Sequence, residues 1–565
     1  MNDTAETPTA EQSPDNRLSI FKADFMASLV VFLVALPLCI GIAVAVGVSP
    51  ARALITGIVG GLIVGFFSGS PLQVSGPAAG LFVIIADLLA KGQEKYLADA
   101  DVDVAEETLT AAATEYSLVI LGLCVFLAGL LQIVAGQLRL GQWFRAVSPA
   151  VIKGMLAGIG ILILASQFHV MLDHQALWHG EKAHGGIQYL ATIPEAIVKC
   201  FSSDTTVNHH LAALTGIIAL CCFVLWPNIV PKKLQFLPAA LIGIVAATLF
   251  AGIAKLQVQR LEVPENMFSE ITLPNIDWLS LATDPMVLTG ACVIALVASA
   301  ETLLCATAVD QMHQGPRTKY DQELMAQGVG NSICGVIGAL PMTGVIVRSS
   351  ANVTSGAKTR YSAIMHGAWL LLFVVAIPFV LTYIPRAALG ALLVYTGYKL
   401  VNFKEIIKLW KTSRGEAGIF FATVIMIVST DLLIGVGVGI ALSAVKLLLK
   451  FSNLSSTLNI APDSKTAHLK LSGAATFINL PTLAGELEQV PAGAELHVEF
   501  DDLRYIDHAC LDLIMNWAKQ HGTVGGTLIM DWEQLQGRFD ASGDSPSDEP
   551  ADSAADSRPA DSSDA

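Results

Sequence analysis

Fourteen apolar stretches divide this 565-residue chain and restrict it to one broad class of fold. About 20 consecutive apolar residues cross the hydrocarbon core of a bilayer as one helix. Hydrophobic residues make up 53% of the chain and charged residues 14%, where a soluble domain carries about 25% charged residues. The stretches occupy residues 25–47, 51–68, 76–90, 117–136, 147–168, 210–226, 236–254, 285–306, 324–340, 343–354, 362–383, 387–401, 416–430 and 432–449. The sequence therefore predicts an all-α polytopic membrane protein with 14 spans.

Two of these stretches are too short to span a membrane, and they stand at matching positions. Residues 76–90 open within SGPAAGLF, residues 343–354 open within LPMTGVIV, and each is the third stretch of its half. Short segments interrupted by Gly or Pro at corresponding positions indicate an inverted repeat with its binding site between two half-helices. We predict a 7+7 inverted repeat, with repeat one at about 20–255 and repeat two at about 285–450. Ordinary spans kinked by a loop are the alternative.

Basic residues predict the orientation in the membrane. With the N-terminus inside, 14 spans place Arg139, Arg145, Lys232, Lys233, Arg317, Lys319, Lys358, Arg360, Lys399, Lys404, Lys408, Lys411, Arg414, Lys446 and Lys450 on the cytoplasmic side. Long segments rich in acidic residues, 91–116 and 255–284, fall on the other side. Because cytoplasmic loops carry an excess of Lys and Arg, we expect a multi-pass protein of the cytoplasmic (inner) membrane with both termini in the cytoplasm.

The composition changes at both ends of the transmembrane region, which we place at 17–450. Residues 1–16 carry four acidic residues and no basic one, and residues 537–565 carry eight acidic residues and two arginines. Both segments have too little apolar surface to fold, so we predict disordered acidic tails. Residues 465–533 alternate strand and helix patterns, which predicts a small cytoplasmic α/β domain.

One acidic residue stands alone in an apolar run. Glu301 lies within VIALVASAETLLCATAVDQ, residues 293–311. A carboxylate is expensive to bury in a membrane, so Glu301 is a candidate functional residue. A proton, a sodium ion or a basic partner would neutralise it, and the sequence leaves these open. On a helix, its neighbours on the same face would be Val297, Ala298, Leu304, Cys305 and Ala308.

The starts of the two short segments offer a site for an anion. First-turn amide N–H groups have no partner within the helix and carry the positive end of its dipole. Arg348 adds a charge that it cannot readily lose, although it could instead form a structural ion pair with Glu301. The candidate substrate-binding residues are Gly76, Ala78, Ala79, Gly80, Thr343, Gly344, Val345, Ile346 and Arg348, and the candidate coupling residues are Glu301, Thr302 and Cys305. Such a site suits a small oxyanion.

Together these features resemble the sulfate permease (SulP) family of anion transporters, over about residues 20–533. The most specific similarity is SAETLLCATAVDQM followed by DQELMAQGVGNSICGVIGALPMTGVIVRSSANVTSGAKTR, and SGPAAG at 75–80 is a second. The resemblance implies that residues 465–533 are a STAS-like domain, truncated because one strand follows LDLIMNWAKQHG.

The chain departs from the family pattern at several positions. Leu38 and Ile42 stand where members usually carry Gln and Tyr, and Ala78 and Cys305 stand where sodium-coupled bicarbonate members have hydroxyls. The loop DHAC, Asp507–Cys510, lacks the hydroxyls that can be phosphorylated in the family's STAS domains. With these departures, the sequence is similar to the branch of the family that is associated with carbonic anhydrase. That branch favours bicarbonate.

The resemblance implies a secondary active transporter of bicarbonate or sulfate, coupled to H⁺ or Na⁺ through Glu301. It implies no enzyme activity and no cofactor. The expected partners are the inorganic anion, membrane lipid, a second copy in a homodimer and, functionally, a carbonic anhydrase. No basic patch suggests nucleic acid. The alternatives are an uncoupled anion exchanger or channel, and a nucleobase transporter, which would normally carry a second acidic residue on the tenth span, near Arg348.

Cysteine and histidine patterns argue against metal centres. The nine cysteines include no C-x-x-C pair, which predicts free thiols. His169, His174, His179 and His184 recur every five residues, whereas metal sites on helices prefer spacings of three or four. We therefore predict surface histidines.

Overall fold

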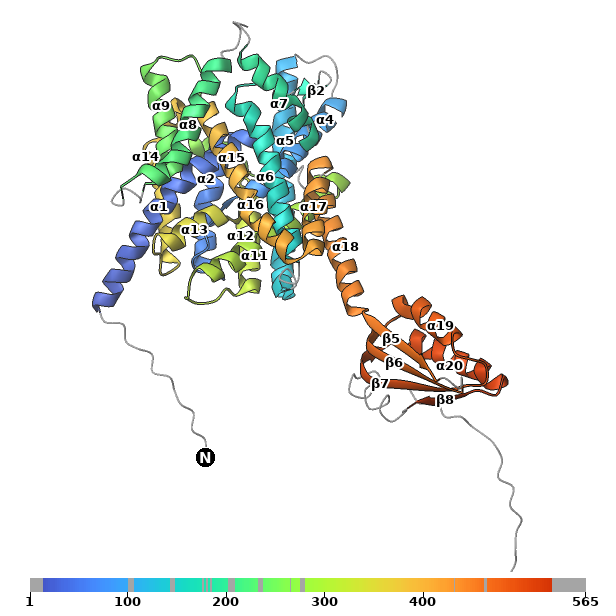
Figure 1. Ribbon diagram of the computed structural model, residues 1–565. Helices are drawn as coiled ribbons and strands as arrows, with labels where there is room; N and C mark the ends of the chain where they lie inside the picture. The colour runs from blue at the N-terminus through green and yellow to red at the C-terminus, as the bar shows by residue number, and fades with distance from the viewer. Residues whose placement is uncertain are drawn as a thin grey trace, which may run out of the picture. The chain divides into compact units, whose positions relative to one another are not determined.

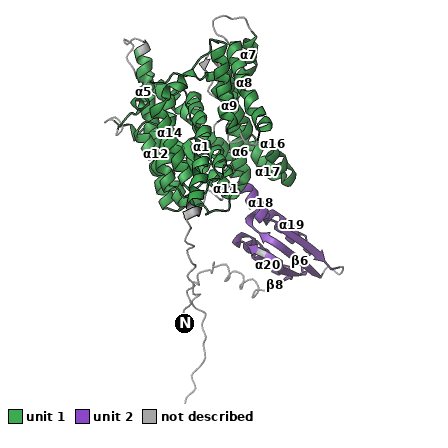
Figure 2. Ribbon diagram, turned by 90° about the vertical axis from the view of Figure 1, so that its left-hand side faces the viewer, with its two compact units in different colours: residues 1–443 green, residues 444–565 purple. Residues whose placement is uncertain are grey.

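A computed structural model describes the chain at residues 14–99, 106–142, 148–174, 177–178, 181–182, 185–201, 209–231, 237–264, 266–274, 280–430, 432–461 and 465–530. These residues belong to two compact units, Met1–Ser443 and Ala444–Ala565 (Figure 2). Most of the two predicted tails, at 1–13 and 537–565, lies outside the described residues.

The first unit consists almost entirely of helices (Figure 1). Its helices in the described residues are α1 (Pro14–Val46), α2 (Pro50–Val59), η1 (Gly60–Val64), α3 (Gly65–Phe67), η2 (Ala79–Leu81), α4 (Phe82–Asp99), α5 (Glu106–Gln137), α6 (Pro149–Met171), α7 (Gly186–Cys200), α8 (His209–Ile229), α9 (Ala239–Ile253), η5 (Met267–Glu270), α11 (Pro285–Met312), α12 (Tyr320–Val336), α13 (Ile346–Thr354), α14 (Tyr361–Ala376), η6 (Pro378–Tyr383), α15 (Arg386–Leu400), α16 (Phe403–Thr412) and α17 (Arg414–Ser429). The helix α18 (Leu432–Phe451) begins in the first unit and ends in the second. Its strands are β1 (Ser75–Pro77), β2 (Leu177–Trp178), β3 (Glu181–Lys182) and β4 (Met342–Gly344). The spacing of apolar stretches did not predict α7 and α16, because neither is a long apolar run.

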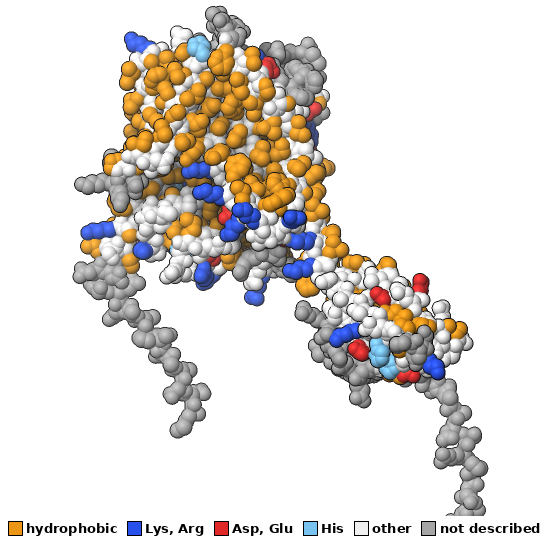
Figure 3. Space-filling view, in the orientation of Figure 1, with side chains coloured by type: hydrophobic (Ala, Val, Ile, Leu, Met, Phe, Trp, Pro, Cys, Tyr) orange, Lys and Arg blue, Asp and Glu red, His pale blue; other side chains and the backbone are white. Residues whose placement is uncertain are grey.

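Seven helices in the described part of the chain are long and apolar enough to cross a membrane, by length and composition. Two shorter apolar helices, α9 and α14, add to them. Figure 3 shows hydrophobic side chains over most of one face of the helical unit, with Lys and Arg gathered toward one end. A broad apolar surface of this kind fits a lipid environment, so the unit is a multi-pass membrane domain.

Both short segments begin with a strand and continue as a helix. β1 leads into η2 and α4, and β4 leads into α13. The two strands pair antiparallel, with Gly76 opposite Thr343. In the sequence they lie more than 260 residues apart, yet this pairing brings the two helix starts into contact. Backbone hydrogen bonds between the strands satisfy polar groups that a membrane would leave without partners.

Close packing of α5 against α12 supports this crossing. A Cβ added at Gly328 would lie 2.7 Å from the carbonyl oxygen of Gly129, and one added at Gly129 would lie 2.6 Å from that of Gly328. Small residues at a helix interface let the two backbones approach closely. The glycines therefore fix α12 near the core of the unit, where it meets β1 and β4.

In its described residues, the second unit contains a four-stranded sheet, two α-helices and the short 3-10 helix η7 (Phe477–Asn479). The strand order is β5-β6-β7-β8, formed by β5 (Leu454–Ile460), β6 (Thr466–Ala475), β7 (Glu495–Ile506) and β8 (Thr527–Met530). β5 runs antiparallel to β6, whereas the other neighbours are parallel. α19 (Leu480–Glu488) and α20 (His508–Thr523) are the crossover helices. β5 lies before the predicted start of the domain at residue 465. Its sequence, LSSTLNI, has few apolar residues and follows directly on the apolar run of α18, so composition did not predict a strand there.

Candidate functional site

A cavity of about 460 Å³, which we call the central cavity, is lined by residues from both halves of the helical unit, and Glu301 is in its wall. The described residues that line it come from α1, η2, α6, α11, β4, α13 and α15. Leu304, Cys305 and Ala308 share the cavity wall with Glu301, as predicted from helical spacing. Leu38 and Ile42 also line it. Leu38 and Ile42, which replace the family's usual Gln and Tyr, therefore make this wall apolar.

Glu301 is placed between the two half-helix starts. Its carboxylate lies beside the backbone N–H of Gly80 and the hydroxyl of Thr343. Its Oε2 is buried without a hydrogen-bond partner, and so is Thr343 Oγ1. No salt bridge joins Glu301 to a basic residue in the described part of the chain. A buried oxygen without a partner is costly, so this carboxyl is available to bind a proton or a cation.

Several amide groups predicted to bind substrate already have acceptors. Thr302 Oγ1 accepts a hydrogen bond from Gly344 N–H at 3.0 Å. The N–H of Ala78 donates to the Pro341 carbonyl at 3.3 Å, and that of Val345 donates to the Val74 carbonyl at 2.9 Å. These bonds hold the two starts in place. Thr302 is thus a positioning residue, and these three N–H groups are not free for a ligand.

The first turn of α13 offers the free donors. Ile346, Val347 and Arg348 line the cavity, and the first backbone bond of this helix runs from Ser349 N–H to the Val345 carbonyl, at 2.9 Å. The N–H groups before Ser349 therefore have no acceptor in the helix. Together with Gly80 N–H, they form an amide cluster in the wall of the same cavity as Glu301, an arrangement that suits a small anion.

Arg348 is fully buried, and its guanidinium forms no ion pair with Glu301. Its NH2 group donates to Cys39 Sγ at 3.2 Å, while Nε and NH1 have no partner. The guanidinium packs against Gly76, where an added Cβ would overlap NH1. His366 is also buried, and both of its ring nitrogens lack a partner. It lies within range of electrostatic repulsion from the Arg348 guanidinium. Arg348 therefore places a fixed positive charge behind the crossing strands.

Gly76, Ala78 and Cys305 have packing roles. Gly76 makes room for Arg348 and does not line the cavity. Ala78 is fully buried, and the side chain of Ala79 lies outside the described residues. Cys305 Sγ lies 3.5 Å from Ser349 Oγ, so this thiol contacts the start of α13 as well as the cavity.

A ladder of polar side chains on α12 holds both crossing strands, and the sequence analysis did not identify it. Glu323, Gln327 and Asn331 recur every four residues along one helix face, and all three are fully buried. Glu323 accepts hydrogen bonds from the Ser68 hydroxyl at 2.6 Å and from Gln73 Nε2 at 2.9 Å. The spacing of polar residues by four in an apolar run was the signal that could have revealed this ladder.

The rest of the ladder reaches the strands themselves. Gln327 Nε2 donates to Ser75 Oγ at the start of β1. Asn331 donates to the Met342 carbonyl at 3.1 Å and accepts from Met342 N–H at 2.8 Å. α12 is therefore the common support of the two half-helix starts.

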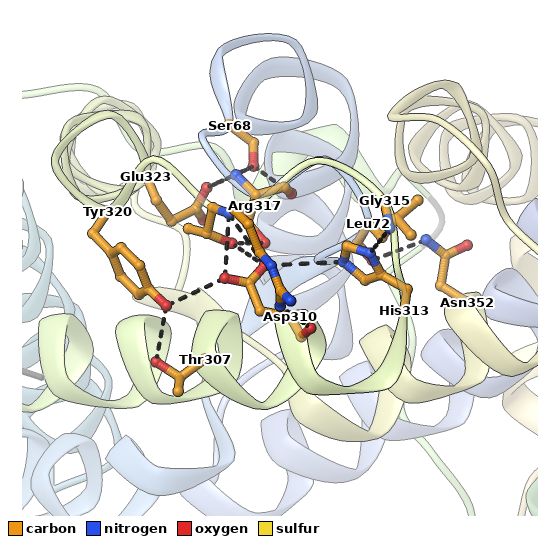
Figure 4. A network of polar contacts seen from close by, with 12 residues as sticks. Ser68, Leu72, Thr307, Asp310, His313, Gly315, Arg317, Tyr320, Glu323 and Asn352 are labelled. Carbon is orange, nitrogen blue, oxygen red and sulfur yellow. Dashed lines mark hydrogen bonds and ion pairs between the residues drawn. The ribbon is translucent and has the colours of Figure 1, made fainter.

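A second, polar cavity of about 570 Å³ adjoins the first and shares Thr307 and Gln311 with it. Asp310 organises its wall: Tyr320 donates to Oδ2 at 3.2 Å, and the Thr318 hydroxyl donates to Oδ1 at 2.9 Å (Figure 4). Thr318 Oγ1 also lies 3.0 Å from Ser70 Oγ; because the single Thr318 hydroxyl proton goes to Asp310, Ser70 is the donor in this contact, which connects the network with the Glu323 end of the ladder.

The prediction of surface histidines is wrong for His169 and His174, which are buried. Their Nδ1 atoms lie 3.0 Å apart, and His169 Nε2 lies 3.0 Å from the Tyr189 carbonyl. Because a carbonyl only accepts, His169 carries its proton on Nε2, so the proton between the rings belongs to His174 Nδ1. His174 Nε2 is then an unpartnered lone pair. The packing of α7 against the end of α6 buries the pair; His179 and His184 lie outside the described residues.

The chain is similar to known membrane transporters over most of its length. A model of the Sulfate permease family matches residues 21–423. YvdB, a sulfate transporter candidate from Bacillus subtilis (strain 168), is 27% identical over 525 residues, 89% of this chain and 90% of that protein. The bicarbonate transporter BicA of Picosynechococcus sp. is 24% identical over 444 residues, 77% of this chain and 71% of that protein.

A solved structure shows the same fold. The overall structure of SLC26A9 superposes with a TM-score of 0.71 at 14% sequence identity, covering 93% of this chain and 87% of that chain. These relatives are transporters and not enzymes. With the family model spanning well over half of its residues, the chain belongs to the sulfate permease family of anion transporters.

Proposed function

We propose that this protein is a secondary active transporter of a small inorganic oxyanion, bicarbonate or sulfate, coupled to H⁺ or Na⁺ through Glu301. The observation that carries the proposal is the unpaired Oε2 of Glu301 in a cavity that the free amides at the start of α13 also line. Anion donors and a cation acceptor thus face one cavity. No cofactor is needed beyond the coupling ion.

The coupling follows from electrostatics. An ionised Glu301 repels an anion bound at the amide cluster, whereas a protonated or sodium-bound Glu301 does not. Cation binding therefore raises anion affinity, and by reciprocity anion binding raises cation affinity by the same factor. Arg348 contributes a positive charge that does not change during the cycle.

The proposed architecture is 14 spans in two inverted repeats of seven. The strand-helix segments β1-α4 and β4-α13 come third in their respective halves and pair antiparallel, which supports the repeat. The distribution of Lys and Arg supports an inner-membrane protein with both termini in the cytoplasm. We also propose a homodimer and a functional association with a carbonic anhydrase, which would supply or consume bicarbonate.

The relatives support the choice of substrate. BicA is named a bicarbonate transporter, and a relative from Arabidopsis thaliana is named sulfate transporter 4.1. Sodium-coupled bicarbonate members have hydroxyls where this chain has Ala78 and Cys305. Because these two residues supply no hydroxyl oxygen for a sodium ion, we favour coupling to protons over coupling to sodium. An uncoupled exchanger or channel remains the rival function, since fixed donors and Arg348 could hold an anion without a cation.

Uptake by proteoliposomes tests the proposal. Labelled bicarbonate and sulfate are offered separately, each with and without a sodium gradient and a pH gradient. Concentrative uptake driven by one gradient supports a coupled transporter and identifies the ion. Exchange without accumulation under either gradient would instead establish the uncoupled exchanger, and uptake of neither anion would reject an oxyanion function.

A further inference from the structure

Two basic residues line the central cavity in the described part of the chain, Arg348 and Lys153. The side chain of Arg348 is fully buried, with its guanidinium packed on Gly76 and bonded to Cys39 Sγ. Lys153 is different, because 39% of its side chain is exposed. Among the described residues, the partly exposed basic side chain that lines this cavity is therefore Lys153.

Lys153 stands at the boundary between the central cavity and a smaller cavity of about 250 Å³. It lies in the second turn of α6, and the smaller cavity is also lined by Lys399, Asn402 and Glu405. Across the central cavity, α11 presents Glu301, Thr307 and Gln311. In the proposed topology this boundary is at the cytoplasmic mouth, because α6 follows the basic segment 139–145.

The ammonium of Lys153 has N–H donors that its contact with Glu405 does not use. It contacts one carboxylate oxygen, Oε2 of Glu405 on α16, at 2.6 Å. An ammonium has three N–H donors, so an anion can bind beside Glu405 or replace it. Lys399, whose Nζ lies 4.5 Å from the centre of the Tyr395 ring, is a second basic residue at the smaller cavity. The two ammonium groups of Lys153 and Lys399 therefore exceed the single carboxylate of Glu405 at this mouth.

We propose that Lys153 binds the transported oxyanion at the mouth of the cavity, before it reaches the amide cluster, and that Glu405 competes with the anion for this ammonium. The inference rests on the proposed function and adds a contact residue that the sequence did not suggest. A partly exposed lysine concentrates anions at a cavity entrance through its field, and salt screens that field.

Two variants that break the same ion pair separate binding from a structural role. Lys153→Gln removes the charge that meets the anion, so we expect KM for the transported anion to rise about tenfold, the equivalent of about 1.4 kcal/mol. Glu405→Gln removes the competitor, so we expect KM to fall about two- to threefold. Lys153→Arg keeps the charge and should stay within about twofold of the wild type. The KM difference between Lys153→Gln and the wild type should shrink as ionic strength rises.

The measurement is initial uptake of labelled anion by proteoliposomes, over a range of anion concentrations, with reconstituted protein quantified for each variant. Equal increases of KM in Lys153→Gln and Glu405→Gln would show that the pair only joins α6 to α16 and would overturn the inference. An unchanged KM in Lys153→Gln would do the same. If Lys153→Gln does not fold, the lowered KM of Glu405→Gln still decides the matter. Failure of the wild type to transport either anion would reject the proposed function itself.

Discussion

Gly80 leaves room for the carboxylate of Glu301. A Cβ added at Gly80 would lie 2.7 Å from Glu301 Oε2 and 3.1 Å from its Cδ. The start of the first half-helix and the acid of α11 are therefore in direct contact, although more than 200 residues separate them in the sequence. A side chain at position 80 must move the carboxylate, which places this contact at the centre of the proposed mechanism.

Gly80→Ala should impair transport without unfolding the protein. The added methyl group displaces the Glu301 carboxylate from the amide cluster, so a cation on Glu301 favours anion binding less, and losing about 1.4 kcal/mol of this coupling would lower cation-driven uptake about tenfold. Uptake kinetics in proteoliposomes measure this effect. Gly418→Ala is the matched control, since a Cβ there meets nothing within 4 Å. Normal kinetics in Gly80→Ala would argue against a functional contact.

Glu301→Gln should separate exchange from accumulation. Glutamine mimics the protonated acid, so proton-coupled protein should keep anion binding and counter-exchange but lose concentrative uptake. If sodium is the coupling ion, glutamine should also weaken anion binding, because sodium loses its charged ligand. Glu301→Ala is measured in parallel, with Glu115→Gln, an exposed acid on α5, as control. Undiminished cation-driven accumulation in both Glu301 variants would leave this residue a structural acid.

Asn331→Ala should destabilise the crossing of the two strands. The change leaves the N–H and the carbonyl of Met342 buried without partners, at a cost of about 1–3 kcal/mol for each group. We expect a lower midpoint of thermal unfolding in detergent and slower transport. Asn228→Ala removes an exposed asparagine that bonds only the Val224 carbonyl, at 3.2 Å, in its own helix. Equal melting temperatures for the two variants would contradict the role of the ladder.

The buried His169–His174 pair should make stability depend on pH. Burial, Lys199, His169 and His209 lower the pKa of His174 from 6.5 to about 4, while Glu195 acts in the opposite sense. As pH falls below 6.5, the unfolded chain binds a proton that the folded chain excludes. Stability should therefore decrease between about pH 6.5 and pH 4, by at most about 3 kcal/mol, and level off below pH 4.

Thermal unfolding of the wild type and of His174→Gln across this range measures the contribution. The free energy of unfolding of His174→Gln should depend less on pH than that of the wild type. His210→Gln, which removes the exposed histidine next to His209 in the sequence, should match the wild type. Parallel profiles for His174→Gln and the wild type would mean that His174 does not titrate in this way.

Asp507→Ala should loosen the start of α20 in the second unit. Asp507 is the N-cap residue, and its Oδ1 accepts a hydrogen bond from Cys510 N–H at 2.8 Å. Loss of such a cap costs about 1 kcal/mol. Hydrogen exchange on the full-length protein should show faster exchange at Cys510, with the exposed Asp512→Ala as control. Unchanged protection at Cys510 would show that the cap does not stabilise the helix.

The sequence alone determined the features that depend on local composition and spacing. Apolar length indicated membrane helices, and proline and glycine marked the short segments, whose helices start at Phe82 and Ile346 after the strands β1 and β4. Glu301 was identified because a lone acid in an apolar run is costly. Helical periodicity placed Leu304, Cys305 and Ala308 beside it, and all three line the cavity.

Only the tertiary structure decided which groups are free to act. The N–H groups of Gly344, Ala78 and Val345 donate hydrogen bonds to Thr302, Pro341 and Val74, respectively, and these acceptors lie in segments distant in the sequence. The same packing turned Arg348 toward Gly76 and Cys39 and left Lys153 accessible. Local sequence fixes which residues can donate or accept, but a hydrogen bond depends on the position of its partner, and distant parts of the chain supply those partners.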